Sequence, residues 1–225
     1  DASTEVLLEL GNGLGGETIS FSNETEFLYH ASGGSSTFPP DPRVWESIDP
    51  SVPEIVFSTV LTEDFSEEMT ASVWSPFTNT FLMGDKDFDF FSVTEDGTTT
   101  KIGEFTLPRR LKGLTFRGSE LYGCANQGQQ LYKLNPSTGQ ALDTISISII
   151  GDISDGCNGL AVDPFTGIMY IVLRPHDALP DGVRYLYTIN HITGSTELVG
   201  ELTNEAVAGI VFLPEPSFMW FVPIF

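Results

Sequence analysis

A short sequence pattern recurs along this chain at intervals of about 40 to 50 residues. Each copy places a small residue before mainly apolar alternate positions, as in a short β-strand with two distinct faces. The copies read ETISF (17–21), TASVW (70–74), KGLTF (112–116), NGLAV (158–162) and AGIVF (208–212). Repeats of this length are typical of the blades of a β-propeller, so the pattern predicts an all-β ring.

The unit from Cys157 to Gly200 shows most clearly what each repeat contains. It has four short apolar runs, and the turn sequences DPFTG (163–167), PDG (180–182) and HITG (191–194) separate them. Asp, Asn, Pro and Gly at such positions favour tight turns. This order of runs and turns predicts a four-stranded antiparallel meander for each repeat.

The two ends of the chain predict how the ring closes. Residues 4–10 (TEVLLEL) are similar to residues 196–202 (TELVGEL), the last strand of the fourth unit. We therefore predict one β-propeller domain of five four-stranded antiparallel blades, in which an N-terminal strand closes the last blade and protects a sheet edge. The predicted blades span 15–62, 68–106, 111–149 and 157–203, and the closing blade combines 1–11 with 206–225.

The last predicted blade lacks its third strand. Its second strand would present unpaired backbone groups to another chain, unless the protein continues beyond Phe225 and supplies the strand itself. The tail is nearly all apolar, which also disfavours exposure to water. We predict that neighbouring copies complete each other here by strand addition. The predicted assembly residues are Phe218, Met219, Trp220, Phe221, Val222, Ile224 and Phe225.

The small residue of each repeat has two interpretations. It suits inner strands that converge on a narrow central channel, or it marks a β-bulge. The position is occupied by Thr18, Ala71, Gly113, Gly159 and Gly209. Five occurrences in the same register favour the first interpretation.

The charge of the chain restricts its partners. Asp and Glu number 31 against 10 Lys and Arg, which gives a formal net charge of -21. This argues against nucleic acid and anionic membrane surfaces, because both require a basic face. It suits either a solvated acidic surface or cation binding. No stretch reaches the ~18 apolar residues of a membrane-spanning helix.

Three features predict a secreted or cell-surface glycoprotein. The cysteine count is even, the chain starts at Asp1 as if a leader had been removed, and Asn23-Glu-Thr25 is an acceptor for N-glycosylation. Cys124 ends the second strand of the third unit, and Cys157 opens the inner strand of the fourth. These positions lie on one face of neighbouring blades, so the two residues form either a disulfide or two separate buried thiols.

The segments GLAVDPFTGIMYIV (159–172) and LYKLNPSTGQ (131–140) resemble secreted bacterial β-propellers of the YVTN/NHL-like kind. The resemblance covers nearly the whole chain and implies the fold, although Asn23-Glu-Thr25 replaces the D-P-x-T-G turn in the first unit. It implies no single function, because this fold carries lyases, lactonases, lectins and scaffolds. Residues 214–217 (PEPS) are similar to the start of a bacterial C-terminal sorting signal, but the following apolar run is short and a basic cluster is missing.

Two groups of carboxylates are candidate Ca²⁺ ligands. Asp152, Asp155 and Asp163 lie around the start of the fourth unit. In Asp85-Lys-Asp-Phe-Asp89, alternation would put three carboxylates on one side of an extended segment. Neither group matches an EF-hand loop, and the alternative is that both are polar turns. No other cofactor is predicted, since the chain lacks the CxxC motif of a zinc site.

The three histidines offer little support for catalysis. His30 ends a predicted second strand, His176 lies in a loop on the same predicted face in another blade, and His191 lies in a turn. An acid–base mechanism would need such groups to converge at the channel mouth. No Ser-His-Asp motif and no phosphate-binding loop is evident.

The sequence therefore predicts a non-catalytic extracellular structural or binding propeller. Its predicted partners are copies of itself, as in a filament, or another surface protein. One alternative is a propeller lyase or lactone hydrolase with a divalent metal at the channel. Another is a glycan-binding module in which the loops 33–42 and 174–183, predicted on one face, bind carbohydrate.

Overall fold

The computed structural model describes residues 18–32, 43–62, 68–125, 129–149, 156–174, 184–202, 206–213 and 219–224, with only the backbone described for 206, 208 and 219–224. These residues form β-strands and turns, and no helix occurs among them. Accordingly, the described part of the chain contains no helix long and apolar enough to cross a membrane.

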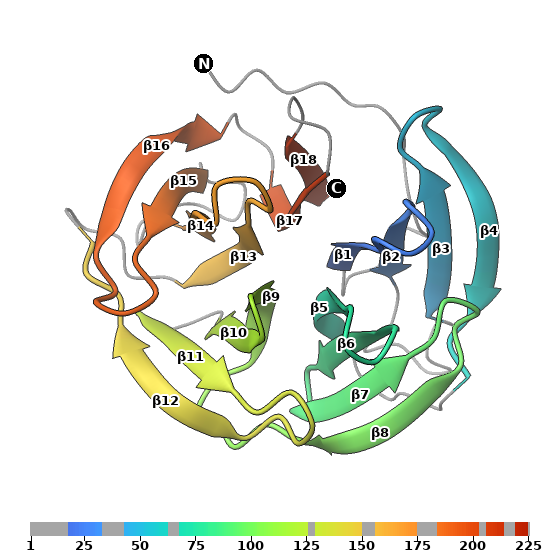
Figure 1. Ribbon diagram of the computed structural model, residues 1–225, viewed down its shortest axis with the longest axis horizontal. Helices are drawn as coiled ribbons and strands as arrows, with labels where there is room; N and C mark the ends of the chain where they lie inside the picture. Colours follow the sequence, from blue (N-terminus) through green and yellow to red (C-terminus); the bar gives the residue numbers. More distant parts are fainter. Residues whose placement is uncertain are drawn as a thin grey trace.

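Four antiparallel sheets of four strands each form the greater part of a ring (Figure 1). Blade 1 contains β1 (Thr18–Phe21), β2 (Leu28–Ser32), β3 (Val44–Asp49) and β4 (Glu54–Val60). Blade 2 contains β5 (Met69–Ser75), β6 (Thr80–Asp85), β7 (Asp89–Val93) and β8 (Thr99–Glu104). Blade 3 contains β9 (Leu111–Arg117), β10 (Glu120–Ala125), β11 (Gln130–Leu134) and β12 (Ala141–Ser146). Blade 4 contains β13 (Cys157–Val162), β14 (Met169–Leu173), β15 (Arg184–Ile189) and β16 (Thr196–Leu202).

A two-stranded sheet occupies the remaining sector of the ring. It pairs β17 (Ala206–Phe212) with β18 (Met219–Ile224) in antiparallel register. The five inner strands surround the axis in the order β1, β5, β9, β13 and β17, and β17 contacts both β13 and β1. The prediction of an all-β propeller is thus confirmed, with four complete blades. The predicted N-terminal closing strand lies outside the described residues.

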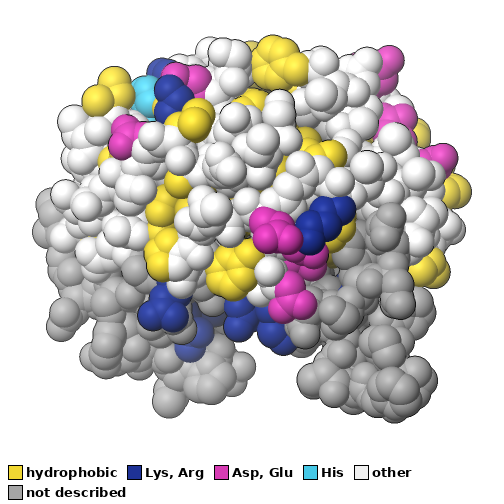
Figure 2. All heavy atoms as spheres, turned by 90° about the horizontal axis from the view of Figure 1, so that it is seen from below, with side chains coloured by type: hydrophobic (Ala, Val, Ile, Leu, Met, Phe, Trp, Pro, Cys, Tyr) yellow, Lys and Arg dark blue, Asp and Glu magenta, His cyan; other side chains and the backbone are white. Residues whose placement is uncertain are grey.

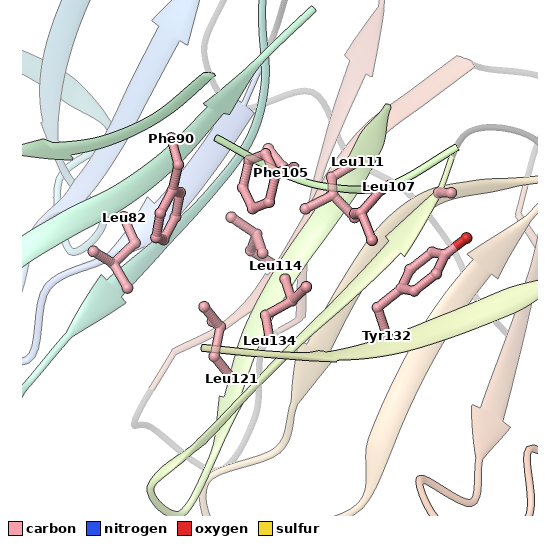
Figure 3. Close-up of a cluster of buried hydrophobic side chains, with 11 residues drawn as sticks. Leu82, Phe90, Phe105, Leu107, Leu111, Leu114, Leu121, Tyr132 and Leu134 are labelled. Atoms are coloured by element: carbon pink, nitrogen blue, oxygen red, sulfur yellow. The ribbon is translucent and has the colours of Figure 1, made fainter. Parts of the chain in front are cut away.

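Apolar side chains between neighbouring blades hold the ring together. Between blades 1 and 2, the ring of Phe81 packs against Tyr29, Trp45 and Trp74 at centroid distances of 4.6 to 5.0 Å. Figure 3 shows the equivalent junction between blades 2 and 3, where Leu82, Phe90 and Phe105 face Leu114, Leu121 and Leu134. The aromatic and aliphatic residues of the repeats therefore form inter-blade cores, as the propeller arrangement requires.

The small residues of the repeat face the next inner strand. A Cβ atom on Gly113 would lie 2.6 Å from the backbone nitrogen of Leu160 in β13. A Cβ on Gly159 would lie 3.1 Å from the backbone nitrogen of Ile210 in β17. The inner strands converge as predicted. The small residue is needed, however, because adjacent inner strands approach each other closely at this position.

Turn chemistry joins the strands as the sequence predicted. In the DPFTG turn, Asp163 Oδ1 accepts a hydrogen bond from the backbone N–H of Phe165 at 2.8 Å. Gly167 closes that turn with φ 68°, a conformation that glycine adopts without a Cβ penalty. These connections bring the end of each inner strand to one face of the ring, and this face carries the site described next.

Candidate functional site

A pocket of about 490 Å³ opens where the inner strands end and turn into the second strands. All five inner strands contribute to it, so it lies on the axis of the ring. Its aromatic lining consists of Phe21, Trp74, Phe116 and Phe212. A concave site of this size, with apolar walls and a few polar groups, is typical of ligand binding.

The polar side chains of the pocket include three hydroxyls and the amide of Asn23. Ser20 of blade 1 and Ser72 of blade 2 share a hydrogen bond of 2.5 Å between their Oγ atoms, and Thr115 adds a further hydroxyl. Arg117 and Asp163 are the charged residues among the described lining. Both carboxylate oxygens of Asp163 already accept hydrogen bonds from its own turn, which keep its pKa below the ordinary value.

Two phenylalanines protrude beside the pocket from equivalent turns. Phe77 lies in the sequence Pro-Phe-Thr-Asn between β5 and β6, and Phe165 lies in Pro-Phe-Thr-Gly between β13 and β14. Each is 62% exposed, and the preceding residues Pro76 and Pro164 line the pocket. The Phe77 ring meets Phe116 edge-on at a centroid distance of 5.6 Å. On blade 2 an exposed ring thus contacts the pocket lining, and on blade 4 an exposed ring directly follows a lining residue.

A small charged group lies on the same face outside the pocket. His191 packs edge-on against Tyr122 at 5.7 Å, and burial together with the positive charge of Arg117 lowers its pKa. Glu120 accepts hydrogen bonds from Lys133 and Tyr122. In the edge-on view of Figure 2, a histidine side chain lies between Lys or Arg and Asp or Glu side chains at the upper edge of the ring. The Glu120–Lys133 pair lies within blade 3, and the contact of Tyr122 with His191 connects blades 3 and 4.

The predicted Ca²⁺ ligands are only partly described. Asp152 and Asp155 lie outside the described residues. Asp163 lies at the end of β13 opposite to Cys157, and its oxygens bind the DPFTG turn. Within the described ranges, no group of three or more His, Cys, Asp or Glu side chains is arranged to hold a metal. The prediction of a Ca²⁺ site at Asp152 and Asp155 stays a prediction.

The alternating aspartates of blade 2 form a turn, so the expected extended segment with three carboxylates on one side is wrong. Asp85 Oδ1 accepts the backbone N–H groups of Asp87 at 2.9 Å and Asp89 at 2.8 Å. Phe88 has φ 71°, and Asp89 points to Lys101 at 2.6 Å. Asp85 is nearly buried, and this burial, with the nearby negative charges, raises its pKa from 3.8 to about 6.

Replacement of Asp85 by asparagine should stabilise the protein at neutral pH. The folded-state pKa lies above the unfolded value, so ionisation of Asp85 lowers the free energy of unfolding as pH rises from about 4 through about 6. Asparagine keeps an oxygen acceptor for the two N–H groups without the charge. We expect Asp85→Asn to raise the free energy of unfolding at pH 7 by on the order of 2 kcal/mol, with the difference disappearing near pH 4.

Urea unfolding at several pH values measures this effect. Asp96→Asn is the matched control, because Asp96 is exposed and its hydrogen bonds to Thr94 and Thr98 lower its pKa. Its substitution should not stabilise the protein at pH 7. A pH-independent effect of Asp85→Asn would contradict the assigned burial cost.

A disulfide joins Cys124 at the end of β10 to Cys157 at the start of β13, with the two Cα atoms 5.8 Å apart. Both residues are buried, so the bond links blades 3 and 4 from within the protein. It lies at the opposite end of the inner strands from the pocket. Its role is therefore to fasten neighbouring blades.

The structure contains a buried histidine–glutamate contact that sequence reasoning missed. His30 Nδ1 lies 3.2 Å from Glu46 Oε2, with side-chain exposures of 0% and 7%. His30 lies within β2, where the pattern had placed it at a strand end. The corresponding cross-strand pair in blade 4 is apolar, Ile171 and Tyr187. The sequence signal for this pair was a polar residue at a position that is apolar in the equivalent strand of blade 4. His176 lies outside the described residues.

The remaining predicted sites concern the surface. Asn23 is exposed in the turn between β1 and β2, and its glycosylation stays a prediction. Of the predicted assembly residues, 219–224 form β18, whose side chains are not described, and Phe218 and Phe225 lie outside the described residues. Among the described strands, only β17 pairs with β18. Pro223 within β18 agrees with an edge position, because proline cannot donate a backbone hydrogen bond.

Comparison with known proteins supports the fold. No protein-family model matches the chain, and no curated protein shows significant sequence similarity. The glutaminyl cyclase of Myxococcus xanthus is similar in structure, with a TM-score of 0.54 and 14% identity over 81% of this chain and 73% of that chain. A chain of a nidogen/laminin complex gives a TM-score of 0.62 and 11% identity over 88% of this chain and 70% of that chain. Identities this low show a shared fold alone, so the resemblance to propellers of the YVTN/NHL-like kind holds at the level of the fold.

Proposed function

We propose that this protein is a non-catalytic, extracellular binding and structural propeller that assembles with copies of itself by strand addition to the β17–β18 sheet. The observation that carries the proposal is the two-stranded described sheet in a ring of four-stranded blades. The outer edge of β18 offers backbone donors and acceptors to a further strand. Strand addition uses these groups for affinity and adjacent side-chain positions for specificity.

A second exposed edge provides an internal comparison. The outer strand of blade 1, β4, exposes Ile55, Val56, Phe57 and Val60, each between 41% and 50%. No charged residue lies between Ile55 and Val60, so this strand lacks the charges that usually protect an edge from pairing. Association through β4 would give the same particle size as association through β18, and the experiment must separate the two.

Particle mass by light scattering, with electron microscopy of the same samples, tests the proposal. We expect wild-type protein to form assemblies that grow with concentration. The variant Phe57→Lys charges the β4 edge and should leave the assemblies unchanged, whereas a chain shortened by removal of 218–225 should have the mass of a single chain. Circular dichroism checks that each variant is folded.

Two results would overturn the proposal. Wild-type protein with the mass of one chain at all concentrations excludes self-assembly altogether. Loss of assembly in Phe57→Lys assigns the contact to β4 and removes β18 from the interface.

A further inference from the structure

The central pocket is unrelated to the edge of β18 and requires its own explanation. It is formed by the ends of five inner strands, and the exposed residues Phe77 and Phe165 directly follow the lining residues Pro76 and Pro164. A phenylalanine that is 62% exposed recurs at the same turn position in blades 2 and 4. Exposed apolar groups that gather around a concave site mark an interaction surface.

The interior of the pocket offers neutral hydrogen-bonding groups. The hydroxyls of Ser20, Ser72 and Thr115 line it. Each inner strand is also the edge of its sheet, so its free backbone N–H and C=O groups turn toward the axis. The wall therefore presents donors and acceptors together, which suits a ligand that has many groups able to do both, such as a polyhydroxylated molecule.

Charge disfavours ionic ligands in this pocket. The net charge of -21 repels anions, and Arg117 disfavours organic cations at the same wall. The carboxylate of Asp163 is occupied by the N–H groups of Phe165 and Thr166 and by the Thr166 hydroxyl. The one carboxylate of the described lining is thus already bound by its own turn.

We infer that the pocket binds a neutral saccharide. The apolar C–H face of a pyranose ring would stack on Phe77 or Phe165, and its hydroxyls would bond to the pocket hydroxyls and backbone groups. The volume of about 490 Å³ is within the range of small-ligand sites, so the end of a glycan fits better than an extended chain. This binding site is independent of self-assembly, and it lies on the face where inner strands end.

A glycan array followed by calorimetric titration of the best neutral oligosaccharide tests the inference. We expect Phe77→Ala or Phe165→Ala to weaken binding about tenfold, because one of the two variants removes the ring on which the sugar stacks. Both rings are exposed, so the variants should fold normally. The matched control is Phe57→Ala, which removes an exposed ring from β4 at a distance from the pocket and should leave the affinity unchanged. Trp74 lines the pocket, so its fluorescence provides a second readout of occupancy.

Several outcomes would overturn the inference. These are an array without neutral ligands, equal affinity in the wild type and both turn variants, or binding only of quaternary ammonium compounds or peptides. Particle mass measured on Phe77→Ala and Phe165→Ala separates this inference from the assembly proposal. Normal assembly with lost saccharide binding supports both, and lost assembly would show that these turns belong to the protein–protein contact.

Discussion

Removal of the Cys124–Cys157 disulfide is expected to lower the free energy of unfolding by about 3 to 4 kcal/mol. The bond joins residues 33 positions apart, and in the chain-entropy description a closed loop of this length restricts the unfolded chain by about that amount. It also connects two blades, so its loss weakens a junction of the ring. The expected change is large beside the marginal stability of most folded proteins.

Denaturant unfolding of the double variant Cys124→Ala, Cys157→Ala measures the effect. Alanine is chosen because both positions are buried and a serine hydroxyl there would need a partner. Wild-type protein unfolded with and without a reducing agent is the companion measurement, while the double variant should be insensitive to reduction. An unfolding midpoint that is the same in all these conditions would show that the bond adds no stability.

Substitution of Gly113 by alanine should be nearly as damaging, at about 3 kcal/mol. The new Cβ would lie 2.6 Å from the backbone nitrogen of Leu160, 2.8 Å from its Cβ and 3.0 Å from Cys124 Sγ. None of these atoms belongs to a flexible side-chain end. The strands β9 and β13 must therefore separate, and the core between blades 3 and 4 loses packing.

The control for this substitution is Gly200→Ala on the outer strand β16. No atom lies within 4 Å of a Cβ added there, and the backbone conformation suits any residue. We expect this change to be neutral or to stabilise the protein by a few tenths of a kcal/mol, because alanine restricts the unfolded chain. Thermal unfolding of both variants gives the comparison, and similar midpoints would contradict the close approach of β9 and β13.

The ring was predictable because its information is local and repeated. Turn sequences such as DPFTG and NPSTG fix each hairpin through bonds between nearby residues, for example Asn135 Oδ1 with the N–H of Ser137. Alternating apolar residues then determine which faces meet the neighbouring blades. Four copies of this pattern of turns and alternating residues specify the architecture.

The features that the pattern did not predict depend on particular side-chain contacts that the repeat does not encode. The aspartates around Asp87 look extended in sequence, but Asp85 folds them into a turn by accepting two backbone N–H groups. The His30–Glu46 pair lies on the strands β2 and β3 of blade 1, whose residues Leu28 and Ile48 pack in one cluster with Leu213. Likewise, the sequence alone does not show that the turns of Phe77 and Phe165 lie at the same pocket, because the ring brings them together.

The contact between β1 and β17 gives the molecule an order of folding. Every complete blade is a meander of sequence neighbours, and the cores between blades 1 and 2, 2 and 3, and 3 and 4 join blades that follow one another along the chain. Only closure of the ring brings together strands from the two ends of the described chain. Contacts between distant segments form late, because the chain first loses the entropy of closing a long loop and only then gains the contacts that stabilise the closed ring. The blades should therefore accumulate in sequence, and the joining of β1 to β17 should set the rate at which the native ring appears.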